Sequence, residues 1–285
     1  MSDNCFSLPC VTVVPSLLCN LKCKHCGTPY LKNKLERSND EIMKDVERFF
    51  KIVDRVEKIF VHGGEPLLYK GLPDLLERIL TYSDRFGGLR IITNGTIVPS
   101  KDTLNVLKKY GEKFRHLMID DYGPILSKKI PEIKEALEKE NIPFFVRDYW
   151  TENAYDGGWY DLGNSEGFLR VLHTPEEAQE IYEKCSVSMS SSCSTIFNGI
   201  WSPCDPVFRR IDLGLSVDIN DYVDLTDENK TVEQQREKIR KILDEKCLDV
   251  CKYCKGMCKD SVRVKAAEQL TSEEFQQITK DLWGM

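Results

Sequence analysis

The sequence predicts an α/β fold in which helices cover a parallel sheet, followed by a small, cysteine-rich α+β region. Short apolar segments alternate with amphipathic segments between residues 11 and 149. The alternation stops after Trp150, and the 12 cysteines gather towards the two ends of the chain. Strict alternation of strands and helices favours a parallel sheet, either open or closed into a full or partial barrel.

Five strands and four helices are expected in the first part of the chain. The strands are short and apolar, as strands buried on both faces are, and are expected at residues 11–17, 58–62, 89–93, 116–120 and 142–149. The helices carry apolar residues at helical period and are expected at residues 39–53, 72–82, 101–110 and 127–140. Open and barrel sheets both place their chemistry at the carboxyl ends of the strands.

The second part is expected to begin near residue 170, which divides the chain into domains of residues 1–170 and 171–285. Residues 151–167 are rich in Gly, Asp, Asn and aromatic side chains and predict a loop. Helices are expected at residues 174–183, 231–245 and 272–283, the last with Ser272 as its N-cap. Residues 185–224 lack a helical period and predict short strands and turns.

Charge and hydropathy exclude several classes of partner. The formal net charge of −6 provides no general basic field for nucleic acid. No apolar run approaches the roughly 18 residues of a membrane span, and the N-terminus lacks the basic start of a secretory signal. These features predict a cytoplasmic protein without nucleic-acid or membrane partners. Its cysteines are expected to stay reduced and to bind metal rather than form disulfides.

Three cysteines lie in one loop directly after the first strand. Cys19, Cys23 and Cys26 are separated by three and then two residues. Such a loop can wrap one metal centre, and thiolates select iron–sulfur clusters or zinc. Three ligands leave one iron of a four-iron cluster open to a second molecule. Zinc is the alternative, although structural zinc sites need four ligands and His25 is awkwardly placed between two of the cysteines.

A glycine-rich turn follows the second strand, in the order His62, Gly63, Gly64, Glu65, Pro66. Two glycines let a ligand approach the backbone closely, and Glu65 can accept hydrogen bonds from an ammonium group. By itself the motif is equally consistent with an ordinary turn. The third strand ends in the segment I-T-N-G-T, which includes Thr93 and Asn94.

Together, the C-x3-C-x2-C and G-G-E-P motifs resemble the radical S-adenosylmethionine (radical SAM) superfamily over roughly residues 10–150. The resemblance implies a partial (β/α)6 barrel and a [4Fe–4S] cluster held by the three loop cysteines, with S-adenosylmethionine on the open iron. It implies cofactor-binding residues at Gly63, Gly64, Glu65, Pro66, Thr93 and Asn94. Reduction by a donor such as flavodoxin or ferredoxin would then yield a 5′-deoxyadenosyl radical, which removes a hydrogen atom from the substrate.

Seven cysteines lie in the second part, at positions 185, 193, 204, 247, 251, 254 and 258. From spacing alone, a structural zinc site is an equal alternative. The C-x13-G-x4-C pattern followed by C-x2-C resembles the SPASM and twitch extensions of radical SAM enzymes, which carry auxiliary [4Fe–4S] clusters. The resemblance implies one auxiliary cluster on Cys185, Cys204, Cys251 and Cys254, with a second cluster as the alternative. Cys193 is an alternative to Cys185, and Cys247 and Cys258 have open roles.

Further candidates lie outside these motifs. Asp120, Asp121 and Tyr122 end the fourth strand, and Arg147 and Asp148 end the fifth. Charged groups at these strand ends can bind substrate, and Asp121 and Arg147 are the candidate catalytic residues among them; ordinary solvated charge is the alternative. Cys193, Cys247 and Cys258 are candidate hydrogen-atom donors, and Cys193 completes the three candidate catalytic residues. Residues 156–161 (D-G-G-W-Y-D) are a candidate sugar-binding loop, and a packed loop is the alternative. Cys5 and Cys10 are expected to be small core residues.

The resemblance to small twitch enzymes implies oxidation or epimerisation at a carbinol carbon of a sugar or cyclitol. The auxiliary cluster would accept an electron, bind substrate or relay electrons. Modification of a ribosomally made peptide is the alternative. A non-catalytic zinc or iron–sulfur protein is the alternative of another class, and the intact G-G-E-P motif disfavours it.

Overall fold

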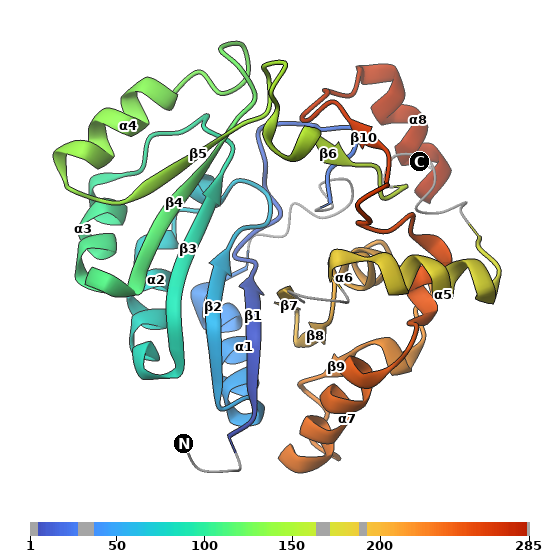
Figure 1. The fold of residues 1–285 in the computed structure, drawn as a ribbon. Coiled ribbons are helices and arrows are strands. Elements are labelled where there is room, and N and C mark those ends of the chain that lie inside the picture. Colours follow the sequence, from blue (N-terminus) through green and yellow to red (C-terminus); the bar gives the residue numbers. More distant parts are fainter. Residues whose placement is uncertain (1–4, 28–36, 164–171, 188–192, 284–285) are drawn as a thin grey trace.

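The computed structural model describes residues 5–27, 37–163, 172–187 and 193–283. Its main feature is an eight-stranded sheet with the strand order β5-β4-β3-β2-β1-β7-β8-β9 (Figure 1). A separate two-stranded sheet pairs β6 with β10. The expected α/β class, with a parallel core, is confirmed.

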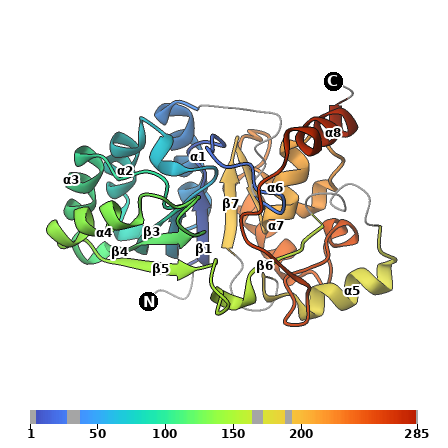
Figure 2. The ribbon, with the colours of Figure 1, turned by 90° about the horizontal axis from the view of Figure 1, so that it is seen from above.

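The first part alternates strands and helices as predicted. Its parallel strands are β1 (Ser7–Val13), β2 (Arg55–Val61), β3 (Phe86–Thr93), β4 (Phe114–Asp121) and β5 (Phe144–Asp148). The helices between them are α1 (Asn39–Ile52), α2 (Leu72–Leu80), α3 (Lys101–Tyr110) and α4 (Ile130–Lys139). Seen from above, the four helices lie outside the curved row of strands (Figure 2). The carboxyl ends of β1–β5 therefore meet along one edge of the sheet.

The apolar core lies between the helices and the sheet. In α1, Ile42, Val46 and Phe49 are buried at helical spacing against the strands. The helix starts with a capping box, because the Ser38 hydroxyl accepts from the Glu41 N–H and the Glu41 carboxylate accepts from the Ser38 N–H. Local sequence and tertiary packing thus select the same helix.

The second part of the chain completes the sheet instead of forming a separate one. Strand β7 (Cys193–Phe197) pairs in parallel with β1, and β8 (Ile200–Ser202) and β9 (Val223–Asp224) continue the sheet in antiparallel fashion. Among the described residues, five strands alternate with four helices, and the sixth parallel strand is supplied by β7. The expected boundary near residue 170 falls within residues 164–171, outside the described residues.

The second part also contains the helices α5 (Pro175–Lys184), α6 (Asp205–Asp212), α7 (Val232–Asp244) and α8 (Ser272–Trp283). Its short strand β10 (Arg263–Val264) pairs with β6 (Trp159–Tyr160) of the first part. Helix α6 lies where only strands and turns were expected, so that prediction was wrong there. Pro206 stands in the first turn of this helix, a helix-start signal that the sequence reasoning missed.

The N-cap of α8 is Thr271 and not Ser272 as predicted. The Thr271 hydroxyl accepts from the Glu274 N–H at 3.1 Å, and the Glu274 carboxylate accepts from the Thr271 N–H at 2.9 Å. Within the described residues, no helix has both the length and the apolar character needed to cross a membrane.

Candidate functional site

The three loop cysteines lie beyond the carboxyl end of β1 and line a cavity of about 430 Å³, here called the loop cavity. Gly63, Gly64, Thr93 and Asn94 line the same cavity, although they follow β2 and β3. The structure thus brings together residues from three segments: the C-x3-C-x2-C motif, the glycine-rich turn and the end of the third strand. Buried Pro66 starts a short 3-10 turn behind them.

Glycine is needed at both positions of the turn because the backbone of the cysteine loop packs directly against them. The sequence reasoning missed this reason. A Cβ atom on Gly64 would lie 2.0 Å from the Leu18 carbonyl oxygen, and one on Gly63 would lie 2.6 Å from that of Ser16. The Gly64 N–H donates to Ser16 O at 3.0 Å, and the Glu65 N–H donates to Leu18 O at 2.7 Å. The parallel pairing of β1 with β2 therefore continues into both loops.

Glu65 is buried, with 1% of its surface exposed, and its carboxylate is held by protein donors. One oxygen accepts from the Leu67 N–H at 3.0 Å and the Thr93 hydroxyl at 2.9 Å; the other accepts from the Asn94 N–H at 2.8 Å. Burial raises the pKa of Glu65 to about 7, against these hydrogen bonds. In this structure, Glu65 therefore ties the ends of β2 and β3 together.

The loop thiols are suited to a cationic centre. Burial raises the pKa of Cys19 to about 11, and the neighbouring Cys26 adds to the rise. Burial raises the pKa of Cys23 still further. Buried thiols without a nearby cation stay protonated, and metal binding reverses this by stabilising the thiolates. The donor set fits a [4Fe–4S] cluster, in which each thiolate binds its own iron.

Two amide side chains contact the loop sulfurs. The Asn94 amide donates to Cys19 Sγ at 3.7 Å, and the Gln269 amide donates to Cys23 Sγ at 3.2 Å. Gln269 lies 246 residues after Cys23, and no local pattern in the sequence pointed to it. It was missed because the contact depends entirely on the path of the C-terminal segment.

The second group of cysteines opens onto another cavity. Cys185, Cys204, Cys251 and Cys254 all line a space of about 490 Å³, here called the thiol cavity. These are the four cysteines that the resemblance implied for an auxiliary cluster. Burial raises the pKa of Cys254 to about 12 and that of Cys204 well above its usual value.

Cys247 and Cys258 lie beside these four. Cys247 forms a hydrogen bond with Cys251, which lowers the pKa of Cys247. Cys258 pairs through its backbone with Cys185 and donates its thiol to the Ile181 carbonyl at 3.6 Å. Across the described parts of the chain, no three His, Cys, Asp or Glu side chains converge on one point where they could hold a single metal ion, whereas the thiolates of a four-iron cluster each bind a different iron.

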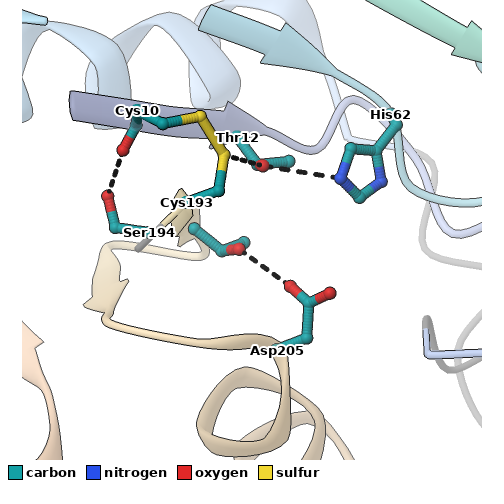
Figure 3. The surroundings of a disulfide bond; sticks show 7 residues. Cys10, Thr12, His62, Cys193, Ser194 and Asp205 are labelled. Atoms are coloured by element: carbon teal, nitrogen blue, oxygen red, sulfur yellow. Dashed lines mark hydrogen bonds between the residues drawn. A yellow bond between two sulfur atoms is a disulfide. The ribbon is translucent and has the colours of Figure 1, made fainter. Parts of the chain in front are cut away.

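Cys193 also lines the thiol cavity, but it forms a disulfide with Cys10 (Figure 3). The two residues face each other in the β1–β7 register, with their Cα atoms 4.5 Å apart. The expectation that all cysteines are reduced therefore fails at this pair, and Cys193 does not replace Cys185. Cys10 is buried as predicted, whereas Cys5 is exposed.

The strand-end charges form a buried ion pair. Arg147 donates to both carboxylate oxygens of Asp120, at 2.6 and 2.9 Å, and both residues line the loop cavity. Asp121 was the predicted candidate, but its carboxylate accepts from the Gly123 N–H at 2.8 Å and lines neither cavity. Because neighbouring side chains on a strand point to opposite faces, a shift of one residue exchanges Asp121 for Asp120.

The two cavities share one wall, formed by His62, Ile92, Arg147, Leu162, Asp205 and Met257. His62 follows β2 and Asp205 begins α6, and Figure 3 shows both beside the Cys10–Cys193 pair. Burial lowers the pKa of His62, and Arg147 adds to this, whereas Asp205 and Asp120 oppose it. A neutral imidazole in this wall can accept a proton. The predicted substrate loop contributes Trp159 and Tyr160 to the loop cavity.

The model of the Radical SAM superfamily matches residues 13–142, which contain the cysteine loop, the glycine-rich turn and β2–β4. Residues 13–142 thus form a radical SAM domain. This domain supplies the carboxyl edge of the sheet and most of the loop cavity.

Curated relatives of the radical SAM domain include GTP 3′,8-cyclase of Limosilactobacillus fermentum, 31% identical over 116 residues. A probable GTP 3′,8-cyclase of Methanococcus maripaludis is 32% identical over 137 residues. The matches cover 39% and 42% of this chain, and 33% and 41% of the relatives. The chain thus spans about two fifths or less of these relatives.

The fold as a whole is similar to that of BtrN, seen in a crystal structure with AdoMet and 2-DOIA. The TM-score is 0.53 at 17% sequence identity, and the match covers 93% of this chain and 98% of BtrN. The similarity concerns the fold, and it extends beyond the radical SAM domain into the cysteine-rich second part.

We expect Gly64→Ala to destabilise the protein by about 1–3 kcal/mol, because its Cβ would collide with the Leu18 carbonyl. Displacement of the loop should also weaken binding of S-adenosylmethionine. Thermal unfolding and equilibrium binding measure the two effects. Gly27→Ala, in the cysteine loop, is the control, because its Cβ would meet only Asp205 Oδ2 at 3.9 Å. Equal behaviour of the two variants would contradict this account.

The ionisation of Glu65 should make stability depend on pH. Its pKa is about 7 in the fold and near 4.5 when unfolded, so the stability it contributes is full below pH 4.5 and is lost as pH rises through 7. The stability difference between wild type and Glu65→Gln should fall by about 3 kcal/mol over this range. Urea denaturation at pH 5, 6, 7 and 8 measures the difference, and a constant value would refute the assignment.

Proposed function

We propose that this protein is a radical SAM enzyme that oxidises a secondary alcohol on a polar ring, such as a sugar or cyclitol. The observation that carries the proposal is the wall shared by the loop cavity and the thiol cavity. A substrate at this wall would lie between the two groups of cysteines. An enzyme that removes a hydrogen atom and then an electron needs this arrangement.

Some residues of the loop cavity would bind the cluster, and others would bind S-adenosylmethionine. Cys19, Cys23 and Cys26 would hold three irons of a [4Fe–4S] cluster, and the backbone of Gly63 and Gly64 would hold S-adenosylmethionine. When bound and reduced, this pair supplies a 5′-deoxyadenosyl radical that removes a hydrogen atom from the substrate. Thr93 and Pro66 support the site from behind, Asn94 lies against Cys19, and Glu65 fixes the strand ends.

The side chains that line the loop cavity suit a hydroxylated ring. Asp120 and Asp205 offer carboxylate oxygens, and Trp159 and Tyr122 offer aromatic faces for the C–H side of a ring. Arg147 is neutralised by its two bonds to Asp120, which disfavours a phosphorylated or strongly acidic substrate. His62 is the neutral base placed to take the proton of the hydroxyl group.

Conversion of a secondary alcohol to a ketone removes one hydrogen atom, one proton and one electron. Cys185, Cys204, Cys251 and Cys254 would hold an auxiliary [4Fe–4S] cluster as the electron acceptor. Epimerisation would instead need a hydrogen-atom donor, for which Cys193, Cys247 and Cys258 were the candidates. In its disulfide with Cys10, Cys193 carries no S–H hydrogen, which removes one of the three candidates and thereby favours oxidation.

The remaining partners follow from this reaction. We propose a flavodoxin or ferredoxin as the electron donor, and the cytoplasm as the location that supplies it. The curated relatives, which are cyclases of GTP, match only about two fifths of the chain. Their substrate is therefore one of the alternatives in the test below, together with a peptide.

The iron content of the protein tests the two groups of cysteines separately. Anaerobic reconstitution should give about eight irons per chain for two clusters, and about four in Cys254→Ala. With dithionite and S-adenosylmethionine, wild type should form 5′-deoxyadenosine, whereas Cys23→Ala should form none. Cys254→Ala should still cleave S-adenosylmethionine, because it leaves the loop cavity intact. Zinc-loaded protein without iron, or full activity in Cys23→Ala, would overturn the proposal.

The substrate class can be tested by isotope transfer. A panel of sugars and cyclitols with deuterium on carbinol carbons should place deuterium in 5′-deoxyadenosine and yield a ketone. Relative to wild type, His62→Gln should lower ketone formation about 10²–10⁴-fold while cleavage of S-adenosylmethionine continues. Transfer only from labelled GTP or a labelled peptide would replace the proposed substrate class, and unchanged ketone formation in His62→Gln would remove the proposed base.

A further inference from the structure

The cysteine loop is paired with a segment close to the C-terminus, residues 266–270, here called the strap. The Lys24 N–H donates to Glu268 O at 2.7 Å, and the Leu270 N–H donates to Lys22 O at 2.8 Å. Cys23 and Gln269 face each other in this short antiparallel bridge. In Figures 1 and 2, the segment between β10 and α8 passes beside the loop that follows β1.

Within the strap, three hydrogen bonds orient the amide of Gln269. Its oxygen accepts from the Lys22 N–H at 2.8 Å, and its nitrogen donates to Ala267 O at 2.8 Å and to Cys23 Sγ at 3.2 Å. An exchange of oxygen and nitrogen would set two donors against each other at Lys22 and two acceptors at Ala267. The network therefore points an N–H group of the Gln269 amide at Cys23 Sγ.

This contact is partly shielded from water. Cys23 is 6% exposed and Ala267 is 1% exposed, and both pack against Leu21. At the rim, Lys24 forms ion pairs with Glu268 at 3.4 Å and Glu274 at 2.9 Å, which link the loop to α8. The strap thus covers one flank of the cysteine loop. Among the described residues of the strap, only Gln269 directs a side-chain amide at a loop sulfur.

We propose that Gln269 is a positioning residue that raises the reduction potential of the cluster held by Cys23. The inference rests on the proposed cluster and concerns its electronic tuning. A hydrogen bond from an N–H group to a ligating sulfur withdraws electron density from the cluster and stabilises its reduced form. Exclusion of water preserves this effect. Reduction adds one electron from the donor and breaks no bond at Gln269. The strap thereby links the C-terminal segment to the ease of radical generation.

The test compares reduction potentials of reconstituted protein in an anaerobic titration followed by electron paramagnetic resonance, using the signal that responds to S-adenosylmethionine. Gln269→Met removes the donor without adding charge, and Gln269→Glu keeps an oxygen for Lys22. Both should give a more negative potential than wild type. Glu274→Gln, which removes a rim ion pair and leaves Gln269 in place, should keep the wild-type potential. Unchanged potentials in both Gln269 variants would overturn the inference.

A second measurement needs no variant and covers the case in which the substitutions prevent cluster assembly. In wild-type protein labelled with ¹⁵N in glutamine side chains, pulsed resonance should detect coupling between the reduced cluster and one amide nitrogen. Absence of this coupling would overturn the inference even if the variants fail to assemble. Protein that binds no iron, or shows no signal responsive to S-adenosylmethionine, would instead refute the proposed function on which the inference rests.

Discussion

The cysteine loop depends on a close approach of two backbone segments beyond β1 and β2. Gly64 and Glu65 donate to the carbonyls of Ser16 and Leu18, so the parallel ladder continues where both strands have ended. The approach is possible because position 64 has no side chain: any Cβ there would overlap the Leu18 carbonyl. The loop that carries the thiols is thereby held at the carboxyl edge of the sheet, facing the loop cavity.

Buried polar groups reinforce this edge from behind. Glu65 collects three donors from the turn and from the end of β3, and Asp120 pairs with Arg147 across β4 and β5. Burial works against the charged form of both carboxyl groups, so their hydrogen bonds offset a real cost. Residues at neighbouring strand ends are thus held in one geometry, which a site for radical chemistry requires.

The second part of the chain is joined to this edge by three long-range contacts. β7 pairs with β1, α6 places Asp205 in the shared wall, and the strap pairs with the cysteine loop. The two cavities adjoin because these segments close around one space. Without this closure, the two groups of cysteines would be separate metal-binding motifs.

The resemblance to SPASM and twitch extensions implied four of the cysteines that line the thiol cavity, and the sequence by itself determined the alternation of strands and helices and the three loop cysteines. Local periodicity and spacing carry this information, because apolar faces and loop lengths are properties of short segments. Only the tertiary structure decided that Cys10 is bonded to Cys193, that Asp120 rather than Asp121 lines the cavity, and that Gln269 contacts Cys23. Strand register and contacts across 183 or 246 residues leave no local pattern, because they arise when distant segments pack together.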